Sequence, residues 1–403
     1  MKKDSASNEV EQPRPTPVHP PAATPRVPRG RLLLLAGGGL GLLAGLNAAL
    51  LRLGLAAPVQ SDSLASLHGI LMLYGFLGTA ITLERAVALQ SDREAFTVWA
   101  YLSPAASALA VLAALLGLAQ PDLFGSHLGP GLLWTLSMVT LVAIYLVIWR
   151  RQQTVFLLIQ ILGAVAGAVG VALWARGLEI PLVLPWWAAF IVLTIVGERL
   201  ELARIAFAGG TTEMRVLLES LLYFLALVAT LFTPAWGYPL MGLALGLLML
   251  DVGYHDIARR TVHTAGLTKF MAASMLAGYG WALLAAGIWV VRGPVLSGYG
   301  YDTVVHALTI GFGLSMVMAH APVIVPAVVR RPVPYHPIMW AIWALLQGGL
   351  LVRVLGGARA TWGQPSAEVA WQFGGAVDVL TVLVFVLSTL TLIIWHGRKD
   401  RTR

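Results

Sequence analysis

The chain has 403 residues, of which 58% are hydrophobic and only 11% are Asp, Glu, Lys or Arg, and its mean hydropathy is +0.78. A soluble domain carries about 25% charged residues, so most of this chain's surface cannot face water. The net charge of +8 comes from basic residues in short stretches between apolar runs, which is typical of membrane topology signals and not of nucleic-acid binding. The absence of cysteine excludes disulfides, iron–sulfur clusters, thiolate copper centres and covalent CxxCH haem attachment within the chain.

The two ends of the chain differ in composition from its middle. Residues 1–30 hold seven prolines and scattered charges, which cannot build a core, so we predict a disordered, Pro-rich cytoplasmic tail. Residues 397–403 are predominantly basic and predict a short second cytoplasmic tail. Residues 31–396 between them form the predicted membrane domain.

Twelve apolar runs, separated by short breaks, make up this domain. Each is about long enough to cross a bilayer as a helix. They span approximately 32–54, 63–84, 96–118, 128–149, 153–175, 181–200, 216–235, 237–256, 269–291, 302–329, 337–358 and 369–395. The fold class is therefore predicted to be all-α, a polytopic membrane protein with twelve transmembrane helices.

The loop charges predict the orientation of these helices. Basic residues follow the even-numbered runs, as in Arg85 and Arg93, Arg150 and Arg151, Arg199 and Arg204, Arg259 and Arg260, Arg330 and Arg331, and the final Arg398, Lys399 and Arg401. The opposite loops hold few, such as Arg176 and Arg292. The positive-inside rule then places both termini in the cytoplasm. We expect a multi-pass protein of a bacterial-type inner (plasma) membrane, in contact with the lipid bilayer.

Three helices that lie four apart in the chain share a spacing. In each, a phenylalanine is followed eight residues later by a polar residue: Phe76 by Glu84-Arg85, Phe190 by Glu198-Arg199, and Phe312 by His320. The pattern favours three successive four-helix units, or arcs. Chance similarity in a Leu-, Ala- and Gly-rich background is the alternative.

The tenth run, YDTVVHALTIGFGLSMVMAHAPVIVPAV at 301–328, carries His306 and His320. On an α-helix, fourteen residues separate them by about 21 Å along the axis and by roughly 40° around it. The helix therefore offers an imidazole near each side of the membrane, where ionisable groups are usually functional. His68, near the outer end of the second helix, matches the depth of His306. Because imidazole is the commonest haem or copper ligand, this pair predicts a b-type haem held non-covalently. Hydrogen bonding to a neighbouring helix or to interfacial water is the other interpretation.

Twelve helices with histidines at the outer ends of the second and tenth resemble subunit I of the haem-copper oxidases and nitric oxide reductases. The segment VHALTIGFG (305–313), together with His68-Gly69, more closely resembles the NnrS family. NnrS proteins are twelve-helix, haem- and copper-containing proteins linked to nitric oxide and nitrosative stress. The resemblance therefore implies haem, copper as a further metal, and nitric oxide or another small gas as a partner. Its twelve-helix plan covers residues 31–396, whereas the motifs cover only parts of helices 2 and 10.

The chain departs from the oxidase pattern at the dinuclear centre. That family places its copper-ligand histidines on helices 6 and 7. Here helix 6 offers Trp186, Trp187 and Glu198, and helix 7 offers Glu219 and Tyr223, with no histidine on either. We therefore expect no dinuclear centre, and we leave open whether the protein is an enzyme and which residues would be catalytic.

Other residues are candidates for the same or a second site. Arg353 and Arg359, near the outer end of helix 11, resemble the position where the oxidase family pairs arginines with haem propionates, and Arg52 is placed to join them. Snorkelling to the interface is the alternative. His320 and His255 lie toward the cytoplasmic side and predict a second haem or metal site, or else a plain polar cluster.

Three further residues bear on the structure of these helices. Pro322 follows His320 directly and predicts a kink or an end of the tenth helix. Asp251 lies one turn before His255 and is placed to orient its ring. Asp378, inside the twelfth helix, requires a partner or a wet cavity.

Three functional interpretations remain open. The first is an NnrS-like haem protein in nitric oxide or redox stress response or in electron transfer. The second is a proton-coupled secondary transporter, although the two related six-helix halves usual for that class are not evident. A respiratory oxygen or nitric oxide reductase subunit is a weaker third.

Overall fold

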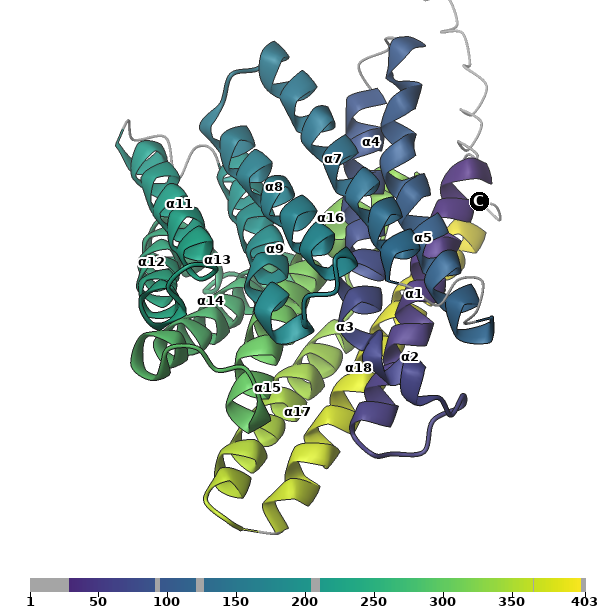
Figure 1. Ribbon diagram of the computed structural model, residues 1–403. Coiled ribbons are helices and arrows are strands. Elements are labelled where there is room, and N and C mark those ends of the chain that lie inside the picture. The colour runs from purple at the N-terminus through teal and green to yellow at the C-terminus, as the bar shows by residue number, and fades with distance from the viewer. Residues whose placement is uncertain (1–28, 91–94, 121–126, 204–210, 365, 400–403) are drawn as a thin grey trace, which may run out of the picture.

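The computed structural model describes residues 29–90, 95–120, 127–203, 211–364 and 366–399, and all regular structure in these ranges is helical (Figure 1). The all-α prediction is therefore confirmed for the described residues. The predicted tail at 1–30 lies outside them except for its last two residues, which already belong to the first helix. The predicted basic tail is described only to Lys399, where the last helix ends.

The helices follow one another with short connections. In chain order they are α1 (Arg29–Arg52), α2 (Asp62–Ser66), α3 (His68–Ile70), η1 (Leu71–Gly78), α4 (Thr79–Gln90), η2 (Ala95–Tyr101), α5 (Leu102–Ala119), α7 (Leu128–Arg151), α8 (Val155–Ala175), α9 (Ile180–Leu202), α11 (Thr212–Ala229), α12 (Pro234–His255), α13 (Ala258–Thr261), α14 (Gly266–Arg292), α15 (Gly298–His306), η3 (Ala307–Leu314), α16 (Ser315–Val329), α17 (Ile338–Thr361) and α18 (Ser366–Lys399).

Among the described residues, 11 helical segments are long and apolar enough to cross a membrane. The remaining predicted run corresponds to α11, which has 18 residues and carries Glu213, Arg215 and Glu219 in its first half. These charges make α11 less apolar than the 11 counted segments, so the prediction of twelve membrane spans stays a prediction.

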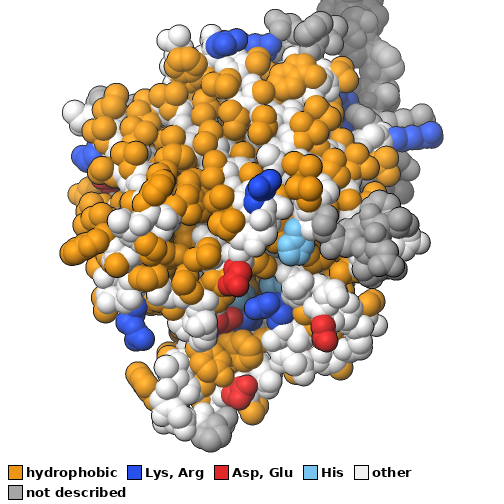
Figure 2. Space-filling model, in the orientation of Figure 1, with side chains coloured by type: hydrophobic (Ala, Val, Ile, Leu, Met, Phe, Trp, Pro, Cys, Tyr) orange, Lys and Arg blue, Asp and Glu red, His pale blue; other side chains and the backbone are white. Residues whose placement is uncertain are grey.

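The outer surface of the bundle is apolar. Figure 2 shows hydrophobic side chains over most of one face of the molecule. Along α18, large apolar side chains such as Phe373, Leu380 and Leu387 are more than half exposed. A surface of this kind is unfavourable in water and suits contact with lipid.

Two of the spans lie deep inside the bundle. In the most apolar stretch of α9, 83% of the residues are buried, and in that of His68–Gln90 67% are buried, whereas the corresponding value for α18 is 22%. Aromatic packing joins the two inner helices, because Tyr74 of η1 stacks on Phe190 of α9 with ring centroids 5.9 Å apart. The Tyr74 hydroxyl also donates to the backbone oxygen of Gly167 at 2.8 Å.

Two spans contain a stretch of π-helix, which the sequence did not predict. Both η1 and η3 are eight residues long; η1 begins three residues after His68, and η3 begins directly after His306. Such wide turns are rare in proteins as a whole, but those that occur are often found at functional sites. Because η3 separates His306 from His320, the estimate that the two rings share one α-helical face does not apply.

Glycines allow neighbouring helices to press against the wide turns. A Cβ atom added at Gly311 of η3 would lie only 2.4 Å from Cγ of Trp281 on α14. One added at Gly41 of α1 would lie 3.0 Å from the carbonyl carbon of Gly75 in η1. The tenth span then continues through Pro322 to Val329, so of the kink or end predicted at Pro322, the end is absent.

Candidate functional site: a histidine-lined cavity

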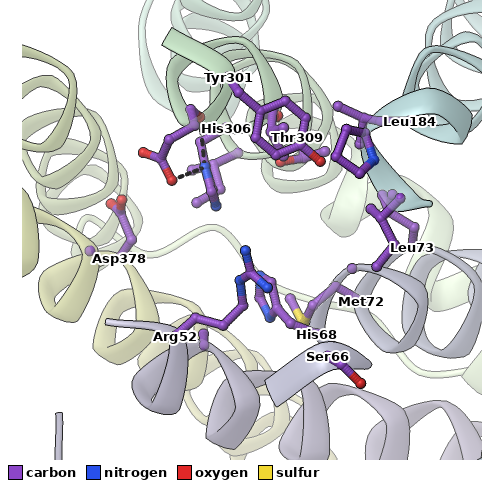
Figure 3. Close-up of a pocket in the computed structure, with 18 of the residues that line it drawn as sticks. Arg52, Ser66, His68, Met72, Leu73, Leu184, Tyr301, His306, Thr309 and Asp378 are labelled. Carbon is purple, nitrogen blue, oxygen red and sulfur yellow. Dashed lines mark hydrogen bonds and ion pairs between the residues drawn. The ribbon is translucent and has the colours of Figure 1, made fainter. Parts of the chain in front are cut away.

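A cavity of about 820 Å³ lies where the end of α1, the helices from α2 to η1, the start of α9, the span from α15 to η3, and the helices α17 and α18 come together. Its size falls within the range of roughly 300–1,000 Å³ that is usual for small-molecule and cofactor sites. His68 and His306 both line it, and they face it from opposite sides (Figure 3). Charged and histidine side chains gather around a hollow in the otherwise hydrophobic face of Figure 2.

Local hydrogen bonds fix the position of His68. Asn47 of α1 holds the following loop by donating to the oxygen of Val59 at 2.8 Å and accepting from its N–H at 2.9 Å. Ser61 then caps the N-terminus of α2. His68 follows α2, and its Nδ1 lies 2.9 Å from the backbone oxygen of Gly45. Because a carbonyl oxygen can only accept, Nδ1 carries the hydrogen and the Nε2 lone pair is left for the cavity.

His306 has the same arrangement. Its Nδ1 lies 2.8 Å from the backbone oxygen of Asp302 and 3.2 Å from Oδ1 of the Asp302 carboxylate. Both atoms accept, so Nδ1 again carries the hydrogen and Nε2 carries the lone pair. A hydrogen bond from the second ring nitrogen to a carbonyl or carboxylate is the usual support of a metal-binding histidine.

The Asp302 carboxylate is held in turn by two other helices. Arg353 of α17 donates to it from Nε at 2.9 Å and from Nη2 at 2.7 Å. The indole N–H of Trp371 on α18 donates at 2.9 Å, and the Arg353 guanidinium lies over that indole ring. Neither Asp302 nor Trp371 was predicted from the sequence as a site residue. The spacing of Asp302 four residues before His306, one helical turn, is the signal that would have found the carboxylate.

The three predicted arginines have different positions. Arg353 lines the cavity but is already paired with Asp302. Arg52, at the end of α1, lines the cavity with its guanidinium directed inward (Figure 3), and it has no hydrogen bond to any other described residue. Arg359 does not line the cavity; it is exposed and donates to Gln364 at 2.9 Å. Arg52 is therefore the cation best placed to meet an anionic group inside.

His320, proposed for a second site, already has partners on both ring nitrogens. Its Nδ1 donates to the backbone oxygen of Met316 at 2.7 Å. Its Nε2 lies 2.8 Å from Nη1 of Arg199, and because a guanidinium can only donate, the lone pair of His320 is used there. Arg199 also makes two hydrogen bonds to Asp256, at 2.9 and 3.0 Å.

His255 lies in a different setting. Its Nδ1 is 3.0 Å from the backbone oxygen of Asp251 and 3.1 Å from its carboxylate, so Asp251 orients the ring as the one-turn spacing indicated. Arg215 of α11 binds the same carboxylate. The structure therefore gives His320 and His255 separate partners and does not join them in one ligand set.

Other residues of the cavity were assigned no ligand role from the sequence. His127 lines it while stacking on Trp174 with ring centroids 4.5 Å apart. Asp378 of α18 lines it too, with only 2% of its surface exposed and with no hydrogen-bond partner for either carboxylate oxygen within the described chain.

The donor set limits what the cavity can hold. Over the described residues, no group of three or more His, Cys, Asp or Glu side chains is arranged to bind a metal ion. A bare metal ion usually requires at least three protein ligands, whereas a haem supplies four nitrogen ligands of its own. Two imidazole lone pairs facing one largely apolar cavity therefore fit a macrocycle-bound iron better than a free ion.

Comparison with known families places the whole membrane domain in one family. The chain belongs to the family described as a domain of unknown function, DUF8744, whose family model matches residues 31–394. The match covers every residue that lines the cavity. A comparison with curated proteins finds no match.

Proposed function

We propose that this protein is a haem-binding integral membrane protein, similar to NnrS, that acts in nitric oxide or redox stress response or in electron transfer. One observation carries the proposal. In His68 and in His306, Nδ1 is hydrogen-bonded to a backbone oxygen, and the lone pair of Nε2 is left for a ligand in the same cavity. When bound, b-type haem would supply one-electron redox chemistry and affinity for small gases such as nitric oxide. We include copper as a further metal only because of the resemblance to NnrS proteins.

The chain's own residues have distinct parts in this proposal. His68 and His306 would hold the iron through their Nε2 lone pairs, and Asp302 keeps the proton of His306 on Nδ1. Arg52 neutralises an acidic group of the bound cofactor. Apolar wall residues such as Phe76 and Leu184 exclude water, which strengthens electrostatic interactions inside.

We also propose that the helices form three arcs of four around the spans that contain Phe76, Phe190 and Phe312. Residues at the repeated positions contact one another across the bundle, which supports this arrangement. Arg85 of the first unit lies 3.3 Å from Glu198 of the second, and Arg199 of the second lies 2.8 Å from His320 of the third. The basic loops favour both termini in the cytoplasm of a bacterial-type cell, which would turn the cavity toward the outer side.

Absorbance spectroscopy of the purified protein tests the haem proposal. The wild type, expressed with haem supplementation, should show a Soret band of low-spin haem. His68→Ala and His306→Ala each remove one side chain that would hold the iron, so each should lose or shift the same component. His127→Ala is the matched control, because it changes a histidine of the same cavity whose ring stacks on Trp174, and it should leave the spectrum intact. A wild-type protein without a Soret band contradicts the proposal.

A proton-coupled transporter is the second candidate, and one cluster favours it. Arg85 is surrounded by the carboxylates of Glu84, Glu198 and Glu201 at 2.8, 3.3 and 3.2 Å. Three carboxylates around one guanidinium form a group able to hold a proton. A proton-driven flux in vesicles by protein free of haem would favour this candidate. The reductase interpretation has less support, since α9 and α11 offer no histidine.

A further inference from the structure

Asp378 is a buried acid that the proposed ligand set does not use. It lies on α18 at the wall of the cavity, and 2% of its surface is exposed. Its Oδ1 packs against Gly349 of α17, where an added Cβ would lie 2.5 Å from that oxygen. Neither oxygen has a hydrogen-bond partner within the described chain. An ionised carboxylate in this position would be both desolvated and unpaired, which is the costly case.

The charges around Asp378 do not compensate it. Arg353 on α17 and Asp302 on α15 interact with it electrostatically, but these two already neutralise each other through two hydrogen bonds. His306 on α15 and Arg52 on α1 also line the cavity. On α18 itself, Glu368 and His396 are the nearest ionisable residues, ten and eighteen positions away. The uncharged form of Asp378 is therefore the one that this environment favours.

We propose that Asp378 is a proton-binding site in the wall of the cavity, protonated when the cavity is empty, and that it exchanges this proton in step with the charge of the bound cofactor. Ferric haem adds one positive charge at the iron, which favours the carboxylate. With haem bound, Asp378 would take up one proton from water when a chemical reductant supplies one electron to the cofactor. On oxidation the electron leaves to the oxidant and the proton returns to water, so the net charge of the cavity stays constant. The coupling rests on the proposed haem site, whereas protonation in the empty protein does not.

Infrared spectroscopy of haem-free protein tests the first half. At neutral pH the wild type should show the carbonyl band of a protonated carboxylic acid, and Asp378→Asn should lose it. Asn is a neutral isostere of the protonated acid, so this variant should fold. Asp62→Asn, which removes an exposed carboxylate from the first turn of α2, is the matched control and should keep the band. A band that survives unchanged in Asp378→Asn overturns the proposal.

Redox titration of the haem-loaded protein at several pH values tests the second half. In the wild type, the midpoint potential should fall by up to 59 mV per pH unit within the window where Asp378 titrates, the equivalent of one proton per electron. That pH dependence should disappear in Asp378→Asn and persist in Asp62→Asn. Equal slopes in the wild type and in Asp378→Asn overturn the coupling. If no haem binds, the proposed function fails, while the infrared result alone decides whether Asp378 holds a proton.

Discussion

The ion pair behind His306 provides a quantitative test of how the cavity is built. Asp302→Ala removes a carboxylate that accepts two hydrogen bonds from Arg353 and one from Trp371. Hydrogen bonds to charged groups contribute about 1.5–3 kcal/mol each, but removing the carboxylate also relieves its own desolvation. The Arg353 and Asp302 side chains are 9% and 17% exposed, so the pair is largely shielded from water. We therefore expect a loss of about 3–5 kcal/mol in the free energy of unfolding, the usual cost of leaving one buried charge without its partner.

A double-mutant cycle separates this effect from a general loss of packing. Arg353→Met should be destabilising for the same reason, whereas the double variant Asp302→Ala/Arg353→Met should cost much less than the two single changes together. Unfolding in mixed micelles of increasing SDS content, followed by tryptophan fluorescence, measures the three variants. Single changes that add within about 0.5 kcal/mol would refute the reasoning, because independent sites behave in that way.

Two further predictions concern packing and pH. Gly311→Ala should destabilise the protein in a thermal shift assay, because the new Cβ would collide with Trp281. Gly280→Ala, whose added Cβ would have no neighbour within 4 Å, should be close to neutral in the same assay. Tyr279→Phe removes a 2.7 Å hydrogen bond to Asp256, which lies just beyond the end of α12. Burial acts to raise the pKa of Asp256, but Arg199 and Tyr279 outweigh it and hold that pKa below its usual value. The stabilisation by this carboxylate is therefore present above the unfolded-state pKa of Asp256 and is lost as pH falls through its folded-state pKa. The difference in stability between Tyr279→Phe and the wild type should therefore become smaller in acid. Unfolding midpoints of both proteins at several pH values measure this difference. A gap that stays constant or widens in acid would contradict this assignment.

Local patterns in the sequence were enough to predict most of the helices. Apolar run length depends only on neighbouring residues and on the thickness of the bilayer, so each predicted run corresponds to a helix of the structure. At α11, three charges in 18 residues leave 11 segments long and apolar enough to cross a membrane in the described ranges, so a twelfth span stays a prediction. The depth of His68 and His306 in the membrane stays a prediction, which rests on their positions within their runs because a helix rises by a fixed length per residue.

Tertiary structure alone decided which of these residues share a site. His68 and His306 lie 238 positions apart and meet one cavity because π-helical turns and glycine contacts set how their helices pack. The lone pair of His320 is used by Arg199, 121 positions earlier in the chain, a pairing that no local spacing indicates. Arg359 resembled a cavity residue by sequence position, yet it lies outside the cavity. Hydrophobic periodicity records which face of a helix is buried, but the identity of the group that it is buried against depends on contacts that form only when distant segments pack together.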